Sequence, residues 1–285
     1  MKVKNYLSLI KFSHTLFALP FAIVGYFLAL EFSAHTFDWL LLGKVILCMV
    51  FARSAAMAFN RYIDRDIDSS NERTAAVREI PRGILKPQAV LMFVIFNSFL
   101  FILTTFFINS ICFYLSPIAL VIVLGYSYTK RFTALCHLIL GIGLALAPIG
   151  AYLAVTGTFA WLPLYLSFAV LFWVAGFDMI YALQDEDFDR SMSLNSIPVA
   201  IGRKATLNLS IFFHLVTAGF MIYIGFLAEA NAWFWIGIAV FLILLIYQHL
   251  IVKPNDLSKV NLAFFTTNGI ASVIFSIFVI LSFYL

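Results

Sequence analysis

The chain has 285 residues, of which 63% are hydrophobic and 11% are charged, and its formal net charge is +4. A soluble globular domain contains about 45–50% apolar and about 25% charged residues, so this composition excludes that class. The sequence instead predicts an integral membrane protein.

Apolar segments of about 20 residues, long enough to cross the ~30 Å hydrocarbon layer of a bilayer, follow one another along nearly the whole chain. We predict an all-α fold in which nine transmembrane helices form a bundle around a central cavity, within a single membrane domain covering 1–285. Only Asn109 and Ser110 separate the third and fourth segments. The predicted spans are 13–30, 39–60, 89–108, 111–128, 135–155, 161–183, 205–228, 233–252 and 262–285.

Lysine and arginine residues occupy alternate loops between these spans. They precede the first span and follow the second, fourth, sixth and eighth, whereas the loops around His35, Asn109, Gly157 and Asn231 contain none. Because Lys and Arg concentrate in cytoplasmic loops, the pattern predicts a cytoplasmic N-terminus and an external C-terminus, in a bacterial inner membrane. This topology accounts for the positive charge, so no nucleic-acid partner is predicted. The sequence gives no indication of the oligomeric state.

Two acidic clusters, N-R-Y-I-D-R-D-I-D and D-E-D-F-D, follow the second and sixth spans on the cytoplasmic side. In the first cluster Asp64 and Asp68 are four residues apart. In the second, Asp185 and Asp189 have the same spacing. On a helix each pair shares one face, where like charges repel. Mg²⁺ relieves such repulsion and typically binds one or two carboxylates together with substrate phosphates, so the clusters predict a diphosphate bound through Mg²⁺.

The clusters also indicate an internal repeat. The separation between Asp64 and Asp185 equals that between the second aspartates of the two clusters, and an Ile-Pro step follows each cluster. We therefore predict two related four-helix halves, about 1–130 and 131–253, followed by a ninth helix at about 261–285. Halves that face each other would bring both clusters to one cavity.

Further polar residues extend the predicted site. Arg53, Asn60 and the first aspartate pair follow one helical stripe, and a charge as deep as Arg53 costs about 2.5–3.5 kcal/mol in lipid, so Arg53 is expected to face a polar interior. Asn60 can offer an oxygen to a metal or an amide to a phosphate. Asp178 is the deepest member of the equivalent stripe on the sixth span. The remaining candidates for substrate binding in this part of the sequence are Arg73, Arg78, Tyr126, Lys130, Arg131 and Tyr181.

Other polar residues receive no functional assignment. Asp66, Glu186 and Asp187 fall on other helix faces, and we expect them to be solvated. The three cysteines form no C-x-x-C pair and the five histidines are scattered, so neither a disulfide framework nor a zinc site is predicted.

Two rival classes share some of these features. An ion-coupled secondary transporter built on an internal repeat also carries buried charges, but its ion sites need not gather at one membrane face. Phosphatidyl transferases also use aspartates at this spacing, but their D-G-x-x-A-R signature is missing here. The acidic pairs at one face therefore favour an enzyme.

The motifs together resemble those of the UbiA superfamily of intramembrane prenyltransferases. The superfamily pattern N-x-x-x-D-x-x-x-D matches Asn60, Asp64 and Asp68, and its D-x-x-x-D matches Asp185 and Asp189. The resemblance covers essentially the whole chain. It includes R-S-A-A-M-A-F-N, R-T-x-x-x-R-E-x-P-x-G, Y-S-Y-T-K-R and Y-A-L-Q-D-E-D-F-D-R.

This resemblance implies transfer of a polyprenyl group from an allylic diphosphate to an aromatic ring. The four aspartates would be the catalytic residues and, with Asn60, would hold two Mg²⁺ ions. Arg53 is a candidate for orienting the acceptor or a phosphate, and Asp178 for accepting a proton or a hydroxyl hydrogen bond from the acceptor. The tyrosines are candidates for stabilising a carbocation by cation–π attraction. The residues that the resemblance suggests for holding the diphosphate are Arg73, Arg78, Lys130 and Arg131.

The acceptor is less closely defined. Y-A-L-Q-D-E-D-F-D-R followed by S-I-P is similar to the branch that prenylates 4-hydroxybenzoate-like acceptors in ubiquinone or menaquinone biosynthesis, including enzymes of the futalosine route. Ubiquinone-type members have Lys-Ser-Thr where this chain has Asn195, Ser196 and Ile197. This difference places Asn195 and Ser196 among the substrate-binding candidates and leaves the acceptor and the prenyl length open.

Overall fold

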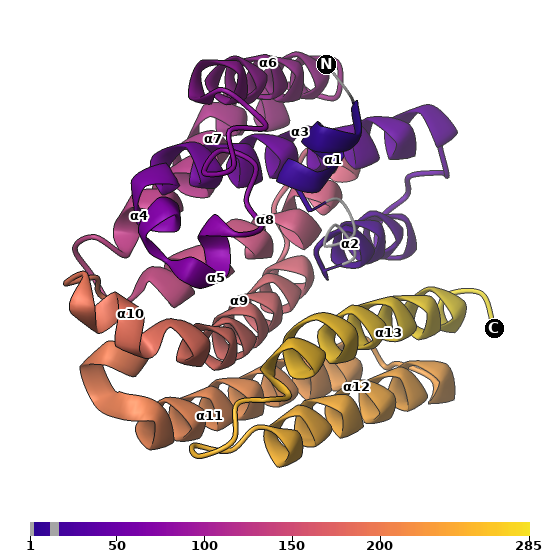
Figure 1. Cartoon of the computed structure of the whole chain (residues 1–285). Helices are drawn as coiled ribbons and strands as arrows, with labels where there is room; N and C mark the ends of the chain where they lie inside the picture. Colours follow the sequence, from indigo (N-terminus) through magenta and orange to yellow (C-terminus); the bar gives the residue numbers. More distant parts are fainter. Residues whose placement is uncertain (1–2, 12–16) are drawn as a thin grey trace.

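The structure, a computed structural model, describes residues 3–11 and 17–285. In these ranges the regular elements are helices, packed side by side in a bundle (Figure 1). A π-helical segment at Leu262–Thr267, here called the π-turn, precedes the last helix, and a short 3₁₀ turn at Leu183–Asp185 precedes α10. The α-helices are α1 (Val3–Leu9), α2 (Leu19–Glu31), α3 (Trp39–Ile63), α4 (Arg65–Ser70), α5 (Glu72–Ala75), α6 (Pro87–Phe106), α7 (Ser110–Thr129), α8 (Cys136–Thr156), α9 (Trp161–Ala182), α10 (Glu186–Ser191), α11 (Ile197–Leu227), α12 (Ala232–Ile251) and α13 (Asn268–Ser282).

Eight helical segments in the described ranges are long and apolar enough to cross a membrane. They correspond to the second to ninth predicted spans. The first predicted span coincides in part with α2, which has only 13 residues, and positions 13–16 of that prediction lie outside the described residues. An all-helical membrane protein is confirmed, whereas the count of nine spans is not.

The third and fourth predicted spans are separate helices, as predicted, although the connection between them is short. α6 ends at Phe106 and α7 begins at Ser110. The Asn109 side chain accepts a hydrogen bond from the Cys112 amide (2.9 Å) and donates one to the Leu153 carbonyl of α8 (2.8 Å). Capping by Asn satisfies an amide group that has no partner within the helix, so Asn109 both starts α7 and ties it to α8.

The helix of the seventh span begins before the predicted segment, but the added part lies before a break. We expected a span at 205–228, and α11 runs from Ile197 to Leu227. Gly202 interrupts it with φ 76° and ψ 166°, a conformation that glycine adopts without steric cost. The interruption separates a short surface turn from the membrane-crossing part and places Arg203 at the start of the latter.

The centre of the bundle is formed by α8 and α9. α8 packs against α2, α7 and α9, while α9 also packs against α11. Trp173 of α9 is completely buried against Phe241 of α12, with ring centroids 5.7 Å apart, and Phe241 in turn contacts Phe275 of α13 at 5.5 Å. This aromatic core fixes α9, and with it the second acidic cluster, relative to α12 and α13.

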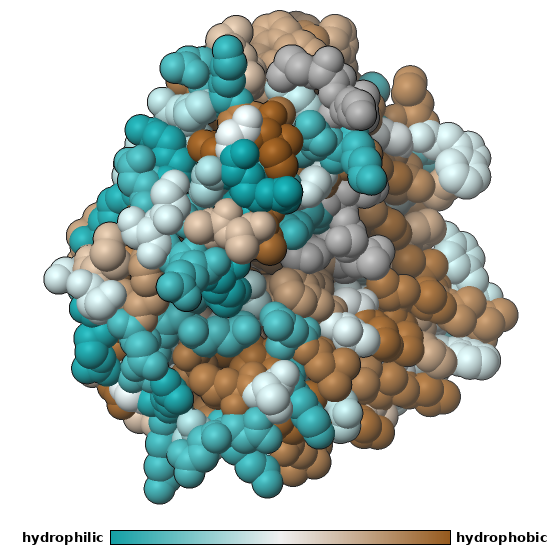
Figure 2. Space-filling view, in the orientation of Figure 1, coloured by the Kyte–Doolittle hydropathy of each residue, from teal (hydrophilic) through white to brown (hydrophobic). Residues whose placement is uncertain are grey.

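The surface divides as expected for a membrane protein. Hydrophilic residues gather over the side of the molecule that carries α4, α5 and α10, and hydrophobic residues cover much of the rest of the face shown in Figure 2. Phe96, Ile118, Phe212 and Ile246 are among the large apolar side chains that are more than half exposed. Such a surface requires contact with lipid.

Close packing of α2 against α8 gives a first prediction. A methyl group added at Gly25 would lie 2.8 Å from Pro148 Cα, whereas one added at Gly43 of α3 meets nothing within 4 Å. We expect Gly25→Ala to lower the free energy of unfolding by about 1–3 kcal/mol through overpacking. Gly43→Ala is the matched control and should be neutral or slightly stabilising. Thermal unfolding in detergent measures both, and equal midpoints would contradict this packing.

Candidate active site

Each acidic cluster lies where its membrane-crossing helix breaks. Asp64 stands between α3 and α4 with φ −88° and ψ 8°, and Asp185 stands before α10 with φ −106° and ψ 4°. Both conformations belong to the sparsely populated bridge region in which many active-site residues are found. The Asp68 amide still donates to the Asp64 carbonyl at 2.7 Å, so this pair keeps its helical spacing across the break.

Both clusters border one polar cavity of about 280 Å³. The structure therefore brings together most of the residues singled out in the sequence. Arg131 and Asn195 are the exceptions. Arg131 reaches the cavity only through its bond to Asp64, and Asn195 contributes its backbone amide to the Lys130 carbonyl (2.7 Å). The predicted residues that line the cavity are Arg53, Asn60, Asp64, Asp68, Arg73, Arg78, Tyr126, Lys130, Asp178, Tyr181, Asp185, Asp189 and Ser196.

Each of the four aspartates forms an ion pair with a different cation. The aspartate side chains are between 3% and 17% exposed and those of their cations between 20% and 36%. The carboxylates thus lie deeper than the cations, which stand nearer to solvent. The pairs are Asp64 with Arg131 (3.0 Å), Asp189 with Lys130 (2.8 Å), Asp68 with Arg78, and Asp185 with Arg73.

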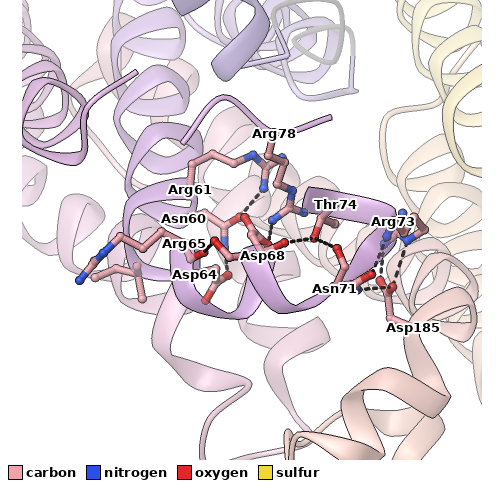
Figure 3. Close-up of polar contacts among 12 residues, drawn as sticks. Asn60, Arg61, Asp64, Arg65, Asp68, Asn71, Arg73, Thr74, Arg78 and Asp185 are labelled. Carbon is pink, nitrogen blue, oxygen red and sulfur yellow. Dashed lines mark hydrogen bonds and ion pairs between the residues drawn. The ribbon is translucent and has the colours of Figure 1, made fainter. Parts of the chain in front are cut away.

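Hydrogen bonds fix the first cluster (Figure 3). Asn60 donates its amide to Asp64 (2.7 Å) and accepts a hydrogen bond from Arg61 (2.9 Å). The Thr74 hydroxyl donates to the Asp68 carbonyl (2.9 Å). Burial raises the pKa of the Asp64 carboxyl above its ordinary value, while the neighbouring Arg131 acts in the opposite direction.

The second cluster is held by the loop that follows the first (Figure 3). Arg73 binds both carboxylate oxygens of Asp185, and Asn71 donates to the same carboxylate (3.2 Å). Arg73 also donates to the Tyr181 hydroxyl (3.2 Å) and lies over the Tyr181 ring. This bidentate contact between distant parts of the chain closes one side of the cavity.

The donor set fits a hard divalent cation. Asp68 keeps one carboxylate oxygen that is buried and has no hydrogen-bond partner, and such orphaned oxygens in a native structure require an explanation. Within residues 3–11 and 17–285, no three His, Cys, Asp or Glu side chains are grouped to hold a metal by themselves. Mg²⁺ suits this arrangement because it binds through one or two carboxylates and takes its other ligands from phosphates and water.

His137 is a site residue that sequence reasoning missed. Its Nδ1 lies 2.7 Å from Asp178 Oδ2, and its Nε2 lies 3.4 Å from the Ile197 amide nitrogen. Both His137 and Asp178 line the polar cavity. The only signal in the sequence was that His137 follows closely after the basic segment Y-S-Y-T-K-R. Its contact with Asp178 could not be read locally, because the two residues are 41 positions apart. The Ser196 hydroxyl and Arg53 Nε are also buried in this cavity without a hydrogen-bond partner.

Other cavity residues were not anticipated either. Asn71 had a readable signal, because Asn before E-R-T-A is a typical helix N-cap, and its side chain does accept from the Arg73 amide (3.0 Å). The aromatic cavity residues near the C-terminus had no such signal in the sequence. The unpredicted residues that border the cavity include Arg61, Asn71, Thr74, Cys136, His137, Phe264 and Phe265.

The expectation that Glu186 is solvated was wrong. Glu186 is buried and binds Arg190 (3.0 Å) and Arg203 (2.7 Å). The contact with Arg203, the first residue after the break at Gly202, could not be read from local spacing, because it spans 17 residues. Asp66 and Asp187 have side chains 85% and 87% exposed, as expected.

A second, apolar cavity of about 380 Å³ adjoins the polar one, and some residues line both. It runs between α3, α7 and α8 and includes the small residues Ala52, Ala119 and Gly150. Its lining ends near Ile108 and Phe159, in the connections α6–α7 and α8–α9 on the opposite side of the bundle from the aspartates. The residues that line both cavities are Arg53, Met57, Tyr126, Leu140 and Leu144.

Comparison with known proteins identifies the family of this chain. The model of the UbiA prenyltransferase family matches residues 18–270. The chain belongs to the UbiA prenyltransferase family. It is therefore an enzyme, a prenyltransferase, and the alternative of an ion-coupled transporter is not supported.

Relatives within the UbiA prenyltransferase family agree in length and fold. A 4-hydroxybenzoate octaprenyltransferase of Nitrosomonas europaea is 30% identical over 84% of this chain and 81% of its own. The apo structure of a UbiA homolog from Aeropyrum pernix K1 superimposes with a TM-score of 0.84 at 31% identity, covering 94% of this chain and 97% of that one. A UbiA homolog from Archaeoglobus fulgidus bound to DMAPP and Mg²⁺ shares the fold, with a TM-score of 0.73 at 22% identity and 99% coverage of both chains.

The contact between His137 and Asp178 gives a second prediction. His137→Leu leaves a largely buried carboxylate without its partner, so we expect the free energy of unfolding to fall by about 1–3 kcal/mol. Replacing both residues by leucine should cost less than the sum of the two single changes, because no orphaned group remains. Thermal unfolding of the four proteins of this cycle measures the coupling. His35→Leu, in an exposed loop, is the control, and additive losses would contradict the contact.

Proposed function

We propose that the protein transfers a polyprenyl group from an allylic polyprenyl diphosphate to a 4-hydroxybenzoate-like aromatic acceptor in quinone biosynthesis, with release of diphosphate. The observation that carries this proposal is the junction of a polar cavity containing four aspartates with an apolar cavity. A polyprenyl diphosphate likewise has a charged diphosphate, which suits the polar cavity, and a hydrocarbon chain, which suits the apolar one. The names of the relatives, 4-hydroxybenzoate octaprenyltransferases, support the acceptor class.

Each pair of aspartates would hold one Mg²⁺ ion, which gives two ions in all. Asp64 and Asp68 form one site and Asp185 and Asp189 the other, with Asn60 either as a further ligand or, through its bond to Asp64, as a support. When bound, the ions neutralise the diphosphate and favour its departure as a leaving group.

The cations would then exchange partners. Arg73, Arg78 and Lys130, which bind the aspartates in this structure, can turn their hydrogen bonds to phosphate oxygens once a metal neutralises the carboxylates. Arg131 can do the same from just outside the cavity lining. Cations already arranged around the diphosphate stabilise the negative charge that grows on it as the bond to carbon breaks.

The prenyl chain would occupy the apolar cavity, with its reacting end at the junction. Tyr126 lines both cavities and Tyr181 only the polar one, and we assign to their rings the stabilisation of the developing carbocation. Arg53, also at the junction, and Asp178 would orient the acceptor. The unpartnered hydroxyl of Ser196 would donate to the acceptor as well, while Asn195 supports Lys130 through its backbone.

The membrane arrangement completes the proposal. We propose that the first predicted span, 13–30, is a membrane span in addition to the eight described ones, and that about 1–130 and about 131–253 are related halves of one domain. The equivalent helix breaks at Asp64 and Asp185 support this relationship. We further propose that the aspartates lie at the cytoplasmic face of a bacterial inner membrane, which the alternation of basic loops supports.

The test of the proposed function is prenyl transfer by the purified protein. With geranyl diphosphate, Mg²⁺ and 4-hydroxybenzoate, we expect a prenylated product that EDTA abolishes. Asp64→Asn and Asp185→Asn should each lower kcat/KM by about 10²-fold or more, because each removes a metal ligand. Asp66→Asn and Asp187→Asn, in the same clusters but exposed, are the matched controls and should retain activity. Equal activity in all four variants, or in EDTA, would refute the metal sites.

The apolar cavity predicts a limit on prenyl length. Gly150 lines this cavity, and a side chain added there meets nothing within 4 Å. Gly150→Phe should therefore fill part of the cavity and raise KM for a long polyprenyl diphosphate by about tenfold or more, with little effect on dimethylallyl diphosphate. Gly219→Phe, on an exposed position of α11 that lines neither cavity, is the control. An unchanged ratio of long to short substrate use would place the chain elsewhere.

A further inference from the structure

Aromatic side chains form one wall of the polar cavity. One lies two residues before α2, and the others come from α9, α10 and the π-turn; they line the polar cavity but not the apolar one. The residues of this aromatic wall are Phe17, Phe177, Tyr181, Phe188, Phe264 and Phe265.

The rings of the wall contact one another and the ion-pair network. Tyr181 and Phe264 have ring centroids 4.2 Å apart, and Phe264 and Phe265 lie edge to face at 4.6 Å. Arg73, the partner of Asp185, lies 5.5 Å from the centre of the Tyr181 ring. The wall therefore begins directly beside the diphosphate end of the cavity.

The π-turn presents Phe264 and Phe265 to the cavity, and a buried amide stabilises it. Asn268 is completely buried, and its Nδ2 donates to the carbonyls of Ala263 (2.9 Å) and Phe264 (3.1 Å). A π-turn widens the helix, and such turns are frequent at functional sites. The Asn268 amide satisfies two carbonyls of this widened turn, which stabilises its shape.

A buried polar network in turn fixes Asn268. The Trp173 indole donates to Asn268 Oδ1 (2.9 Å), and Asn268 donates to Gln248 Oε1 (3.2 Å). Gln248 lies 3.4 Å from His214 Nδ1, and all four side chains are buried. Networks of this kind specify one arrangement of a core because each member loses a hydrogen bond if another moves. The network belongs to α9, α11, α12 and α13, and no member of it lines either cavity.

The position of the apolar cavity indicates which substrate would lie against the aromatic wall. The two cavities share lining residues of α3, α7 and α8, whereas the wall comes chiefly from α9 and the π-turn. With the prenyl chain in the apolar cavity and the diphosphate at the aspartates, the aromatic wall is the part of the polar cavity left for the second substrate. Offset and edge-to-face contacts between aromatic rings contribute about 0.5–1.5 kcal/mol each beyond area burial.

We propose that Phe264 and Phe265 bind the planar ring of the aromatic acceptor, and that Asn268 is the positioning residue that holds the π-turn which presents them. This inference rests on the proposed function and names the surface on which its second substrate lies.

Steady-state kinetics with 4-hydroxybenzoate and geranyl diphosphate test the inference. Phe264→Leu and Phe265→Leu keep an apolar side chain but remove the ring, and each should raise KM for 4-hydroxybenzoate about three- to tenfold. KM for geranyl diphosphate should change less than twofold. Asn268→Asp keeps the size of the side chain but loses the amide donors. It should likewise raise KM for 4-hydroxybenzoate and leave KM for geranyl diphosphate nearly unchanged.

Matched controls separate this effect from simple loss of stability. Phe234→Leu removes a buried ring from the core of α12, and Asn97→Asp changes a buried asparagine of α6 that donates to a backbone carbonyl; neither residue lines a cavity. Both should leave KM for 4-hydroxybenzoate unchanged even if the melting temperature falls. Unchanged acceptor KM in the wall variants, or an equal rise in both KM values, overturns the inference while wild-type transfer upholds the proposed function. Absence of Mg²⁺-dependent transfer by the wild type overturns both.

Discussion

The pairing of four aspartates with four cations is the interaction on which the site depends. Four carboxylates around a cavity of about 280 Å³ would repel one another without compensation. The compensating cations all come from the segment 73–131, although two of the aspartates belong to 185–189. Arg73 and Lys130 therefore bind the second cluster to the first part of the chain. The same contacts neutralise the site and join the two parts of the bundle.

The depth of the aspartates makes these pairs sensitive to the loss of the cation. Removing one member of a fully buried ion pair leaves an uncompensated buried charge, whereas solvent reduces this cost for the partly exposed pairs here. Within each ion pair the aspartate is less exposed to solvent than its cation. Removing a cation should thus disturb the protein more than removing its aspartate. The exposed ends of the cations remain able to reach a ligand from solvent.

The features that depend on local spacing can be predicted from the sequence. In the site these are the two aspartate pairs and the basic loops, and in the fold the Asn109 helix boundary. The sequence did not reveal contacts that depend on distant packing. His137 meets Asp178 only because α8 packs against α9, and Glu186 binds Arg203, which lies 17 residues away, beyond the break at Gly202. The π-turn has no periodic signal, since its change of pitch is stabilised by Asn268 through a tertiary network.

The proposed exchange of partners would have a consequence for the end of the reaction cycle. Each cation that would bind the pyrophosphate has a carboxylate within reach, as the ion pairs of this structure show. Once the transferred group had left, the pyrophosphate would compete with these tethered anions for the same guanidinium and ammonium groups. The protein would thus carry its own competitor, which would favour product release and return the pocket to its starting state.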